Sequence, residues 1–467
     1  MFADQHLASL GGAQVSMRLQ RRFLERAGHT VTIVAPSPST KRRSTDADEA
    51  SPPDESSRPD ELSDSDGSSA PGEAPSVHDA EEAPAPSVHD AENGPAPSVH
   101  DAENASAPDE RRGDEGEIGT PSIPITPDRE YGLSWPGRRT DRFVDAELAK
   151  RPPVDVVHIQ GDFWGALTGH RYARREGLPV VHTMHNRVDV GLEAIVAFPG
   201  LALRALNAWR RRVLPLAIEP EPYGVDGWAY LAGLAAFSDA VTAPSAHFAR
   251  RLEAHGVYPH VDVIWNGIDD DALDAAIVAG PVVRQPGPPR FVWLGRMSPE
   301  KRLLPFIEAV AASRVRADVE VIGGGVQEGP ARRMIERLKP AASITFAGRL
   351  PYEETLRRIA AADAVVQTSI GFETQGMTVF EAASLGTPAV VSDPDIAHEL
   401  GSGYWPVGDG LIPDASTHAL ARALRAAAGD IAAGKAPTPD PTTGERFRQS
   451  SRTEAMLEVY RRVTGAG

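Results

Sequence analysis

The sequence predicts an α/β protein built from two doubly wound domains that face each other across a cleft, each a parallel sheet flanked by helices. Short β-branched runs alternate with helical stretches along most of the 467 residues, which is typical of buried parallel strands. The chain is 41% hydrophobic and too long for one compact core, so two domains of ordinary size are expected. Residues 285–289, Gln-Pro-Gly-Pro-Pro, are interpreted as the linker between them.

The N-terminal domain is expected to comprise residues 1–38 and 118–284. A helix is predicted at 16–27, ended by Gly28 as a left-handed cap. Strands are predicted at 30–36, 154–159, 179–183, 240–243 and 261–265. Residues 1–3 look like the tail of a strand. Either the first strand is very short or the natural start lies a few residues upstream.

The C-terminal domain is expected to comprise residues 285–442. Its strands are predicted at 290–294, 318–322, 343–346, 364–367 and 389–391. A last helix at 443–463 is expected to pack back on the N-terminal domain. Doubly wound sheets bind ligands at the carboxyl ends of their strands, so the cleft between the two domains is the predicted ligand site.

Residues 39–117 form a low-complexity insert rich in Pro, Ser, Ala, Asp and Glu. The heptapeptide Pro-Ser-Val-His-Asp-Ala-Glu occurs three times with a period of eleven, starting at Pro75, Pro86 and Pro97. An eleven-residue period can mark a helical supercoil, but the prolines and scarce apolar residues favour a disordered segment. Repeat expansion without a site is favoured over a weak metal site formed by the repeat histidines His78, His89 and His100.

The insert also carries nearly all of the net charge. The formal net charge is −17, and the 22 acidic and 6 basic residues of the insert contribute −16 of it. The rest of the chain lacks the clustered basic face of a nucleic-acid-binding protein. The absence of cysteine excludes disulfides and thiolate chemistry and suits a cytoplasmic location. No run is long enough to cross a bilayer, and the N-terminus lacks the order of a signal peptide.

The strongest chemical signal is the segment 371–388, Gly-Phe-Glu-Thr-Gln-Gly-Met-Thr-Val-Phe-Glu-Ala-Ala-Ser-Leu-Gly-Thr-Pro. A glycine-bearing loop that opens a helix presents free backbone N–H groups at the positive end of the helix dipole, which suits a diphosphate. Glu381, about one turn into the helix, can accept from two ribose hydroxyls, and Glu373 in the loop can reach a hexose hydroxyl. On spacing alone, solvated acids at a helix start explain the pattern equally well.

This pattern of two glutamates eight residues apart resembles the family-four retaining glycosyltransferases of GT-B fold. Further segments resemble motifs of that family in the same order. They are Gly11-Gly12 (first glycine-rich loop), 154–158 (Asp-Val-Val-His strand), 183–185 (active-site histidine strand), 243–245 and 265–269 (last N-domain turns), 295–301 (donor-phosphate motif), 322–325 (glycine turn, with Gly324 where an acid is usual) and 347–349 (nucleotide-base loop). The resemblance covers nearly everything except the insert.

The resemblance implies which residues act. The catalytic residues would be His185 and Glu373. The donor nucleotide-sugar would be bound by Gly12, Arg296, Lys301, Gly323, Arg349, Gly376, Met377, Thr378 and Glu381. Arg296 and Lys301 suit phosphate oxygens, because a guanidinium offers a planar fork of donors and an ammonium a compact charge.

The resemblance also implies retention of anomeric configuration without a protein nucleophile, cofactor or metal. The acceptor hydroxyl would attack on the leaving-group face and pass its proton to the departing phosphate. His185 would contact the donor sugar, with a hydrogen-bonded core histidine as the alternative. His158 and His182 are interpreted as core residues, whereas Asp162 and Trp164 are candidates for acceptor contact.

The donor stays open between UDP-glucose and GDP-mannose. The variant Glu373-Thr-Gln-Gly376 looks closest to the diacylglycerol glucosyltransferase branch, which implies a membrane lipid acceptor such as diacylglycerol or a glycolipid. The alternatives are a soluble inositol phosphate or sugar acceptor, a nucleotide-sugar epimerase of the same fold, and an inactive scaffold. Glu373 and Glu381 as paired hydrolase carboxylates are disfavoured, because they do not face each other across one bond.

A candidate membrane-binding helix lies at residues 201–214. Ala202, Leu206, Trp209 and Val213 form one apolar stripe, and Arg204, Arg210, Arg211 and Arg212 lie mainly off it. A basic amphipathic helix with tryptophan can lie on an anionic bilayer, which would make the protein peripheral on the inner membrane face. Packing of the stripe on the sheet explains the same periodicity.

Overall fold

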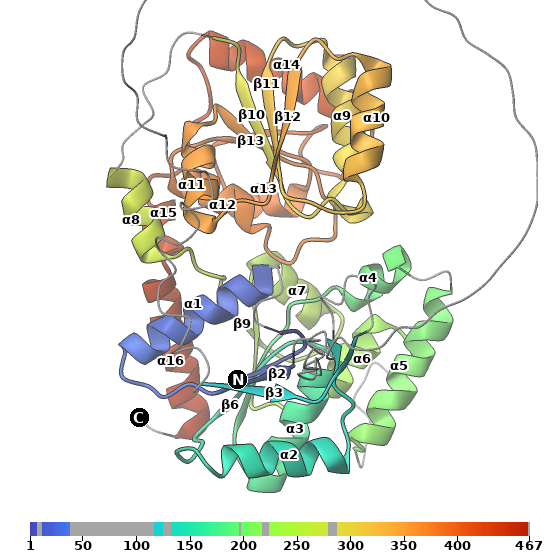
Figure 1. Ribbon diagram of the computed structural model, residues 1–467, viewed down its shortest axis with the longest axis vertical. Helices are drawn as coiled ribbons and strands as arrows, with labels where there is room; N and C mark the ends of the chain where they lie inside the picture. Colours follow the sequence, from blue (N-terminus) through green and yellow to red (C-terminus); the bar gives the residue numbers. More distant parts are fainter. Residues whose placement is uncertain are drawn as a thin grey trace, which may run out of the picture. The chain divides into compact units, whose positions relative to one another are not determined.

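The computed structural model describes residues 1–6, 12–37, 116–124, 132–195, 198–216, 224–278 and 287–465. Two parallel sheets and the helices that cover them account for most of these residues (Figure 1). Gly11, linker residues 285–286 and residues 39–115 of the insert, with the three repeat histidines, lie outside the described residues. The prediction of two doubly wound domains is confirmed.

The N-terminal sheet has seven parallel strands among the described residues, in the order β3-β2-β1-β6-β7-β8-β9. They are β1 (Phe2–Ala3), β2 (Ile33–Pro36), β3 (Glu117–Thr120), β6 (Val157–Gln160), β7 (Val180–Thr183), β8 (Ala240–Ala243) and β9 (Val261–Val263). A separate antiparallel pair joins β4 (Ile123–Pro124) to β5 (Gly132–Leu133). The strand order reverses between β1 and β6, so the loops after these strands diverge and leave room for a ligand.

The C-terminal sheet has six parallel strands in the order β12-β11-β10-β13-β14-β15. They are β10 (Arg290–Leu294), β11 (Asp318–Ile322), β12 (Ser343–Gly348), β13 (Ala364–Gln367), β14 (Ala389–Val391) and β15 (Tyr404–Pro406). The reversal falls between β10 and β13. Arg296 follows the first of these strands and Glu373 the second, so the fold brings both predicted residues to one switch point.

Helices cover both faces of each sheet. In the N-terminal domain they are α1 (Gly12–Arg26), α2 (Arg138–Leu148), α3 (Trp164–Glu176), α4 (Val188–Ile195), α5 (Pro199–Val213), α6 (Gly227–Ala235) and α7 (Ala246–Ala254). In the C-terminal domain they are the 3₁₀ turn η1 (Pro299–Lys301), α9 (Leu303–Ser313), α10 (Glu328–Leu338), α11 (Tyr352–Ala361), α12 (Met377–Ser384), α13 (Pro394–Leu400) and α14 (Thr417–Ala432).

The two-residue period of a strand divides the C-terminal core into two layers. Phe291 and Trp293 of β10 pack with α9 and α14 on one face. Val292, between them, packs with α11 and α12 on the other (Figure 1). The sheet is therefore buried on both faces, which is why its strands are apolar throughout.

One helix near the domain boundary departs from the expected division of the chain, and the last helix follows it. The helix α8 (Asp270–Val278) packs on α11, and Ala272, Leu273 and Ala276 belong to the C-terminal core. The chain thus enters that core near Ile268, earlier than the expected boundary at residue 284. At the end of the chain, α15 (Thr443–Arg446) leads into α16 (Gln449–Thr464), which packs against α1 and β7 of the N-terminal domain.

Candidate active site

The glycine turns after β10 and β11 bring two loops of the C-terminal domain into contact. Gly323 has a φ of +126°, and a Cβ atom there would overlap the carbonyl oxygen of Gly295. Gly325 has a φ of +148°, and its Cβ would lie 2.8 Å from the carbonyl oxygen of Met297. Only glycine allows this approach of the backbones, and it sets the position of the loop that carries Arg296.

The two predicted phosphate-binding cations lie on this loop and on η1. Arg296 is half exposed, and its Nη2 lies 3.3 Å from Oε1 of Glu300. Lys301 ends η1, and its Nζ forms an ion pair with Oε1 of Glu373. The structure therefore joins the loop after β10 to the loop after β13 through a charged pair.

Glu373 lies among groups that stabilise its carboxylate. Ser369 Oγ donates to Oε1 at 2.8 Å, beside the contact with Lys301. Burial alone would raise the pKa of Glu373, but Lys301, Ser369 and the charge of Arg296 hold it below its ordinary value. Glu373 is thus an ionised acceptor at neutral pH.

The loop with Glu373 ends at the N-terminus of α12. Gly376 caps the helix with a φ of +78°, and a Cβ there would lie 2.8 Å from Cδ1 of Ile396. Met377 and Thr378 follow as its first two residues, so their backbone N–H groups belong to the first turn. This end of the helix has the positive dipole that favours an anion.

Glu381 lies one turn further along α12 and is buried. Its Oε1 accepts a hydrogen bond of 2.9 Å from the hydroxyl of Tyr352 on α11. Burial raises the pKa of Glu381, and this hydrogen bond opposes the rise. The two glutamates therefore differ in electrostatic surroundings, with cations beside Glu373 and a neutral hydroxyl beside Glu381.

Two other predicted donor residues lie at the edge of this group. Arg349 follows β12 and is exposed, and its Nε lies beside Gly324, 3.4 Å from where a Cβ would stand. Gly12 opens α1 after the first strand of the N-terminal sheet. Gly324, where the resembled family usually has an acid, thus leaves space that Arg349 partly fills.

His185 follows β7 in the N-terminal domain. Its Nε2 lies 2.7 Å from Oε1 of Gln160, and its backbone N–H donates to Oδ2 of Asp162 at 3.0 Å. Burial lowers the pKa of His185 to about 4, although the charge of Asp162 opposes this. The ring is neutral near pH 7 and can donate or accept a hydrogen bond there.

Asp162 and Trp164, the candidates for acceptor contact, are both buried. Asp162 Oδ2 also accepts from the backbone and side-chain nitrogens of Asn186, at 2.9 and 2.7 Å. Trp164 Nε1 donates to the carbonyl oxygen of Asp4. Asp162 instead fixes the loop that carries His185.

The interpretation of His158 and His182 as core residues agrees with the structure, where both are buried. His158 Nε2 lies 2.7 Å from Oγ1 of Thr183, and its Nδ1 contacts the hydroxyl of Tyr460 on α16. His182 Nε2 donates to the carbonyl oxygen of Gly161 at 2.8 Å.

The helix expected at residues 201–214 is α5, and its structure corrects the predicted membrane face. The side chains that were expected to enter a bilayer pack partly buried against the N-terminal core: Leu206, Trp209 and Val213. Trp209 also contacts Trp135, with ring centroids 5.5 Å apart. Arg210 is fully buried, and Arg211 donates to the carbonyl oxygen of Gly224 at 2.9 Å. The stripe belongs to the core because it continues the inward face of the helix.

Sequence reasoning missed Tyr352 and Ser369, and it missed the positioning role of Asp162. Tyr352 binds Glu381, Ser369 binds Glu373, and Asp162 holds the backbone of His185. Tyr352 and Asp162 reach their partners through the fold, 29 and 23 residues away in sequence. Ser369 lies only four residues before Glu373, but no motif marks it. Among the described residues, no group of three or more His, Asp or Glu side chains is placed to hold a metal ion.

Two family models match the chain. Residues 96–272 match Glycosyltransferase Family 4, and residues 281–427 match Glycosyl transferases group 1. Together the two matches span the larger part of the sequence and include the loops described above. The chain belongs to the family-four glycosyltransferases of GT-B fold.

Three curated relatives support this assignment at low identity. The alpha-monoglucosyldiacylglycerol synthase of Streptococcus pneumoniae is 26% identical over 285 residues, 58% of each chain. The 2-deoxystreptamine glucosyltransferase of Streptomyces kanamyceticus is 27% identical over 52% of this chain and 60% of its own. The sulfoquinovosyl transferase of Arabidopsis thaliana is 26% identical over 55% and 46%. The matches span about half the length of these relatives.

A solved structure supports the fold over nearly the whole chain. Sucrose-phosphate synthase from Thermosynechococcus elongatus superimposes with a TM-score of 0.59 at 16% identity. The superposition covers 98% of the present chain and 94% of the synthase. In the described part of the chain, no helix has the length and apolar character needed to span a membrane.

Proposed function

We propose that the protein transfers a hexose from a nucleotide-sugar to an acceptor hydroxyl with retention of configuration. The observation that carries this proposal is the meeting of Lys301 and Glu373 at the switch point of the C-terminal sheet. At this point cations that suit a diphosphate and carboxylates that suit sugar hydroxyls lie on adjacent loops.

The leaving nucleoside diphosphate gains negative charge as the glycosidic bond to phosphate breaks. Arg296, Lys301 and the N-terminus of α12 would stabilise that charge without a metal, because fixed dipoles and cations need no reorganisation during the reaction. Glu381 would accept from the ribose hydroxyls, and Glu373 from a hydroxyl of the hexose.

The acceptor hydroxyl would form the new bond to the anomeric carbon on the face that the phosphate leaves. Its proton would pass to the departing phosphate oxygen, so charge and atoms balance without a protein base. His185, neutral because burial lowers its pKa to about 4, would hydrogen-bond the sugar and would not need to carry the proton.

For the acceptor we propose a lipid of the diacylglycerol class, or a glycolipid built on it. The matched synthase of Streptococcus pneumoniae carries diacylglycerol in its name, and α5 offers a surface suited to a bilayer. Phe198 and Leu201 at its start are 75% and 67% exposed. Arg204 and Arg212 lie on the same exposed face of the helix, where they can attract anionic headgroups.

A soluble acceptor is the second candidate, favoured by the match to 2-deoxystreptamine glucosyltransferase. The two candidates separate in one assay. Purified protein is supplied with labelled UDP-glucose or GDP-mannose and, in parallel, diacylglycerol in vesicles, inositol phosphate or an aminocyclitol. Labelled glycolipid supports the lipid proposal, whereas label only in the soluble acceptor contradicts it and leaves hexosyl transfer intact.

Membrane contact is tested by sedimentation with vesicles that contain anionic lipid. Arg204→Gln with Arg212→Gln should weaken binding about thirtyfold, since each arginine near an anionic surface contributes about 1 kcal/mol. The matched control is Arg422→Gln with Arg425→Gln, exposed on α14. Equal binding of both double variants would contradict this use of α5.

A further inference from the structure

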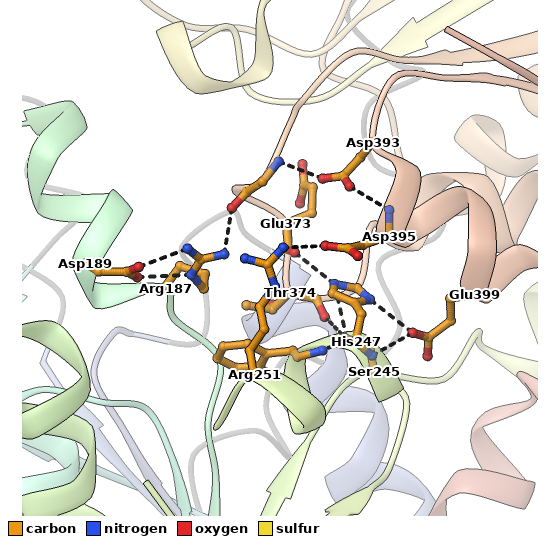
Figure 2. Close-up of polar contacts among 12 residues, drawn as sticks. Arg187, Asp189, Ser245, His247, Arg251, Glu373, Thr374, Asp393, Asp395 and Glu399 are labelled. Carbon is orange, nitrogen blue, oxygen red and sulfur yellow. Dashed lines mark hydrogen bonds and ion pairs between the residues drawn. The ribbon is translucent and has the colours of Figure 1, made fainter. Parts of the chain in front are cut away.

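The loop 371–376, which carries Glu373, is held by side chains of the other domain (Figure 2). Three side chains contact its backbone carbonyl oxygens: one from the loop after β7, one from the loop after β8 and one from the first turn of α7. The pairs are Arg187 Nη1 with Gly371 O at 2.9 Å, His247 Nε2 with Glu373 O at 3.2 Å, and Ser245 Oγ with Thr374 O. Because these contacts are made to backbone carbonyl oxygens, they fix the path of the loop's main chain.

A fourth contact closes the far end of the same loop. The side chain of Gln375 is buried and forms two hydrogen bonds with the backbone of Asn266. Its Oε1 accepts from Asn266 N at 2.9 Å, and its Nε2 donates to Asn266 O at 3.1 Å. The loop is thus held from both of its ends.

Glu399 on α13 binds the residues of the N-terminal domain that contact the loop. Its Oε1 accepts from the backbone of Ala246 and from Nε1 of Trp265, at 2.7 and 2.8 Å. Its Oε2 accepts from the backbone N and Nδ1 of His247, both at 3.0 Å. A carboxylate of the C-terminal domain therefore caps α7 and orients the ring of His247 toward the carbonyl of Glu373.

The proposed nucleotide-binding part of the site, unlike the loop 371–376, is held by contacts within one domain. Glu381 bonds Tyr352 on α11, and both belong to the C-terminal domain. Displacing the loop would therefore move the glutamate that faces the hexose and leave the glutamate that faces the ribose in place.

We propose that Arg187, Ser245 and His247 are positioning residues through which the N-terminal domain sets recognition of the donor's sugar. This inference rests on the proposed function and deepens it. The nucleoside diphosphate is bound by the C-terminal domain alone, whereas the hexose is recognised only while the carbonyl oxygens of the loop are held. None of the three side chains needs to touch the donor.

The test compares two ligands in full-length variants by titration calorimetry. The ligands are UDP and UDP-glucose, or GDP and GDP-mannose if the wild type prefers guanine. His247→Asn keeps a donor near the position of Nδ1 and loses the contact with Glu373 O. His247→Gln can place its amide near Nε2 and restore that contact. The matched control is His260→Asn, a largely exposed histidine of the same domain.

We expect His247→Asn to weaken nucleotide-sugar binding about tenfold, as for the loss of one buried hydrogen bond, and to change nucleoside diphosphate binding less than twofold. His247→Gln should recover most of the loss. Arg187→Met provides a second variant with the same expected split, should His247→Asn fold poorly.

Equal loss of both ligands, or no loss of either, in folded variants would overturn the inference. If the wild type binds the nucleotide-sugar and the variants bind it equally well, the inference is overturned but the proposed function is not. A wild-type protein that binds neither nucleotides nor nucleotide-sugars would overturn the proposed function, and the inference with it.

Discussion

Residue by residue, the two glutamates of the donor site have opposite electrostatic surroundings. Cations hold the pKa of Glu373 below its ordinary value, whereas burial raises that of Glu381. As pH falls, Glu381 therefore takes up a proton first. In the proposed function the ribose hydroxyls would donate to the carboxylate of Glu381, and a protonated Glu381 would accept less well. We therefore expect donor affinity to fall on the acid side as Glu381 becomes protonated.

Tyr352→Phe tests this assignment. Removing the hydroxyl removes a hydrogen bond that favours the ionised form of Glu381, so its pKa should rise further. We expect the KM for the donor to increase about tenfold at pH 7 and its acid limb to move to higher pH. The measurement is donor KM against pH.

The matched control is Tyr258→Phe, whose hydroxyl donates only to the carbonyl oxygen of Ser238, at 3.1 Å. Its KM profile should equal that of the wild type. An unchanged profile in Tyr352→Phe would show that Tyr352 does not act on Glu381.

Among the elements, strand pairing decides what can be done with the insert. Strands β2 and β3 are parallel neighbours, with Ile33 opposite Glu117 and Pro36 opposite Thr120. The sequence alone predicts that residues 40–114 can be deleted with little effect. The pairing changes this prediction, because parallel strands need a crossover of about a dozen residues or more and the deletion would leave five.

We therefore expect replacement of residues 40–114 by about 15 Gly/Ser residues to preserve both activity and stability. The shorter connection costs less closure entropy, by about 1.2 kcal/mol, so the melting temperature should stay equal or rise slightly. Thermal unfolding of the two versions checks this. The direct deletion serves as the strained comparison, and a collapsed melting temperature with the linker would show that the insert is structural.

The elements also show what could be read from the sequence. The first five strands of the C-terminal sheet and the loop before α12 were predictable, because β-branched runs and glycines with positive φ have local causes. The strands β3 and β15 were missed because Glu117–Thr120 holds one large apolar residue and Tyr404–Pro406 ends in proline. The face of α5 was misassigned because Asn207 and Arg210 point inward, where a periodicity count expects apolar residues.

In the site, the glutamates and cations were predictable from their spacing and family order. Their partners were not. Tyr352 and Glu381 are 29 residues apart and His247 and Glu373 126 apart. Such pairs arise from strand order, which a single sequence does not fix.

For the whole molecule, buried neutral histidines set the response to acid. Burial lowers the pKa of His158 and His170 well below the ordinary value, and that of His185 to about 4. Their contribution to stability is complete above pH 6.5 and is lost as pH falls toward the folded-state values. Asp4 acts in the opposite direction, because burial and the charge of Asp162 raise its pKa to about 7.

Between pH 6 and 5 the unfolded chain should thus bind about two more protons than the folded one, a loss of about 3 kcal/mol per pH unit. Urea unfolding at pH 7, 6 and 5 measures this slope. His170→Phe should reduce the slope by about half, whereas His260→Gln, exposed, should leave it unchanged. A flat profile in the wild type would contradict the neutral state of these histidines.

The most direct test of the proposed transfer follows the reaction by proton NMR, with UDP-glucose or GDP-mannose and a diacylglycerol acceptor in vesicles. We predict donor consumption matched by a product that retains the α configuration. Arg296→Ala and Glu381→Ala should slow transfer by about 10²-fold or more with unchanged melting temperatures, while Arg333→Ala on the exposed face of α10 keeps the wild-type rate. An inverted product, or near-native turnover in the folded Arg296 and Glu381 variants, would contradict the assignment of the donor site.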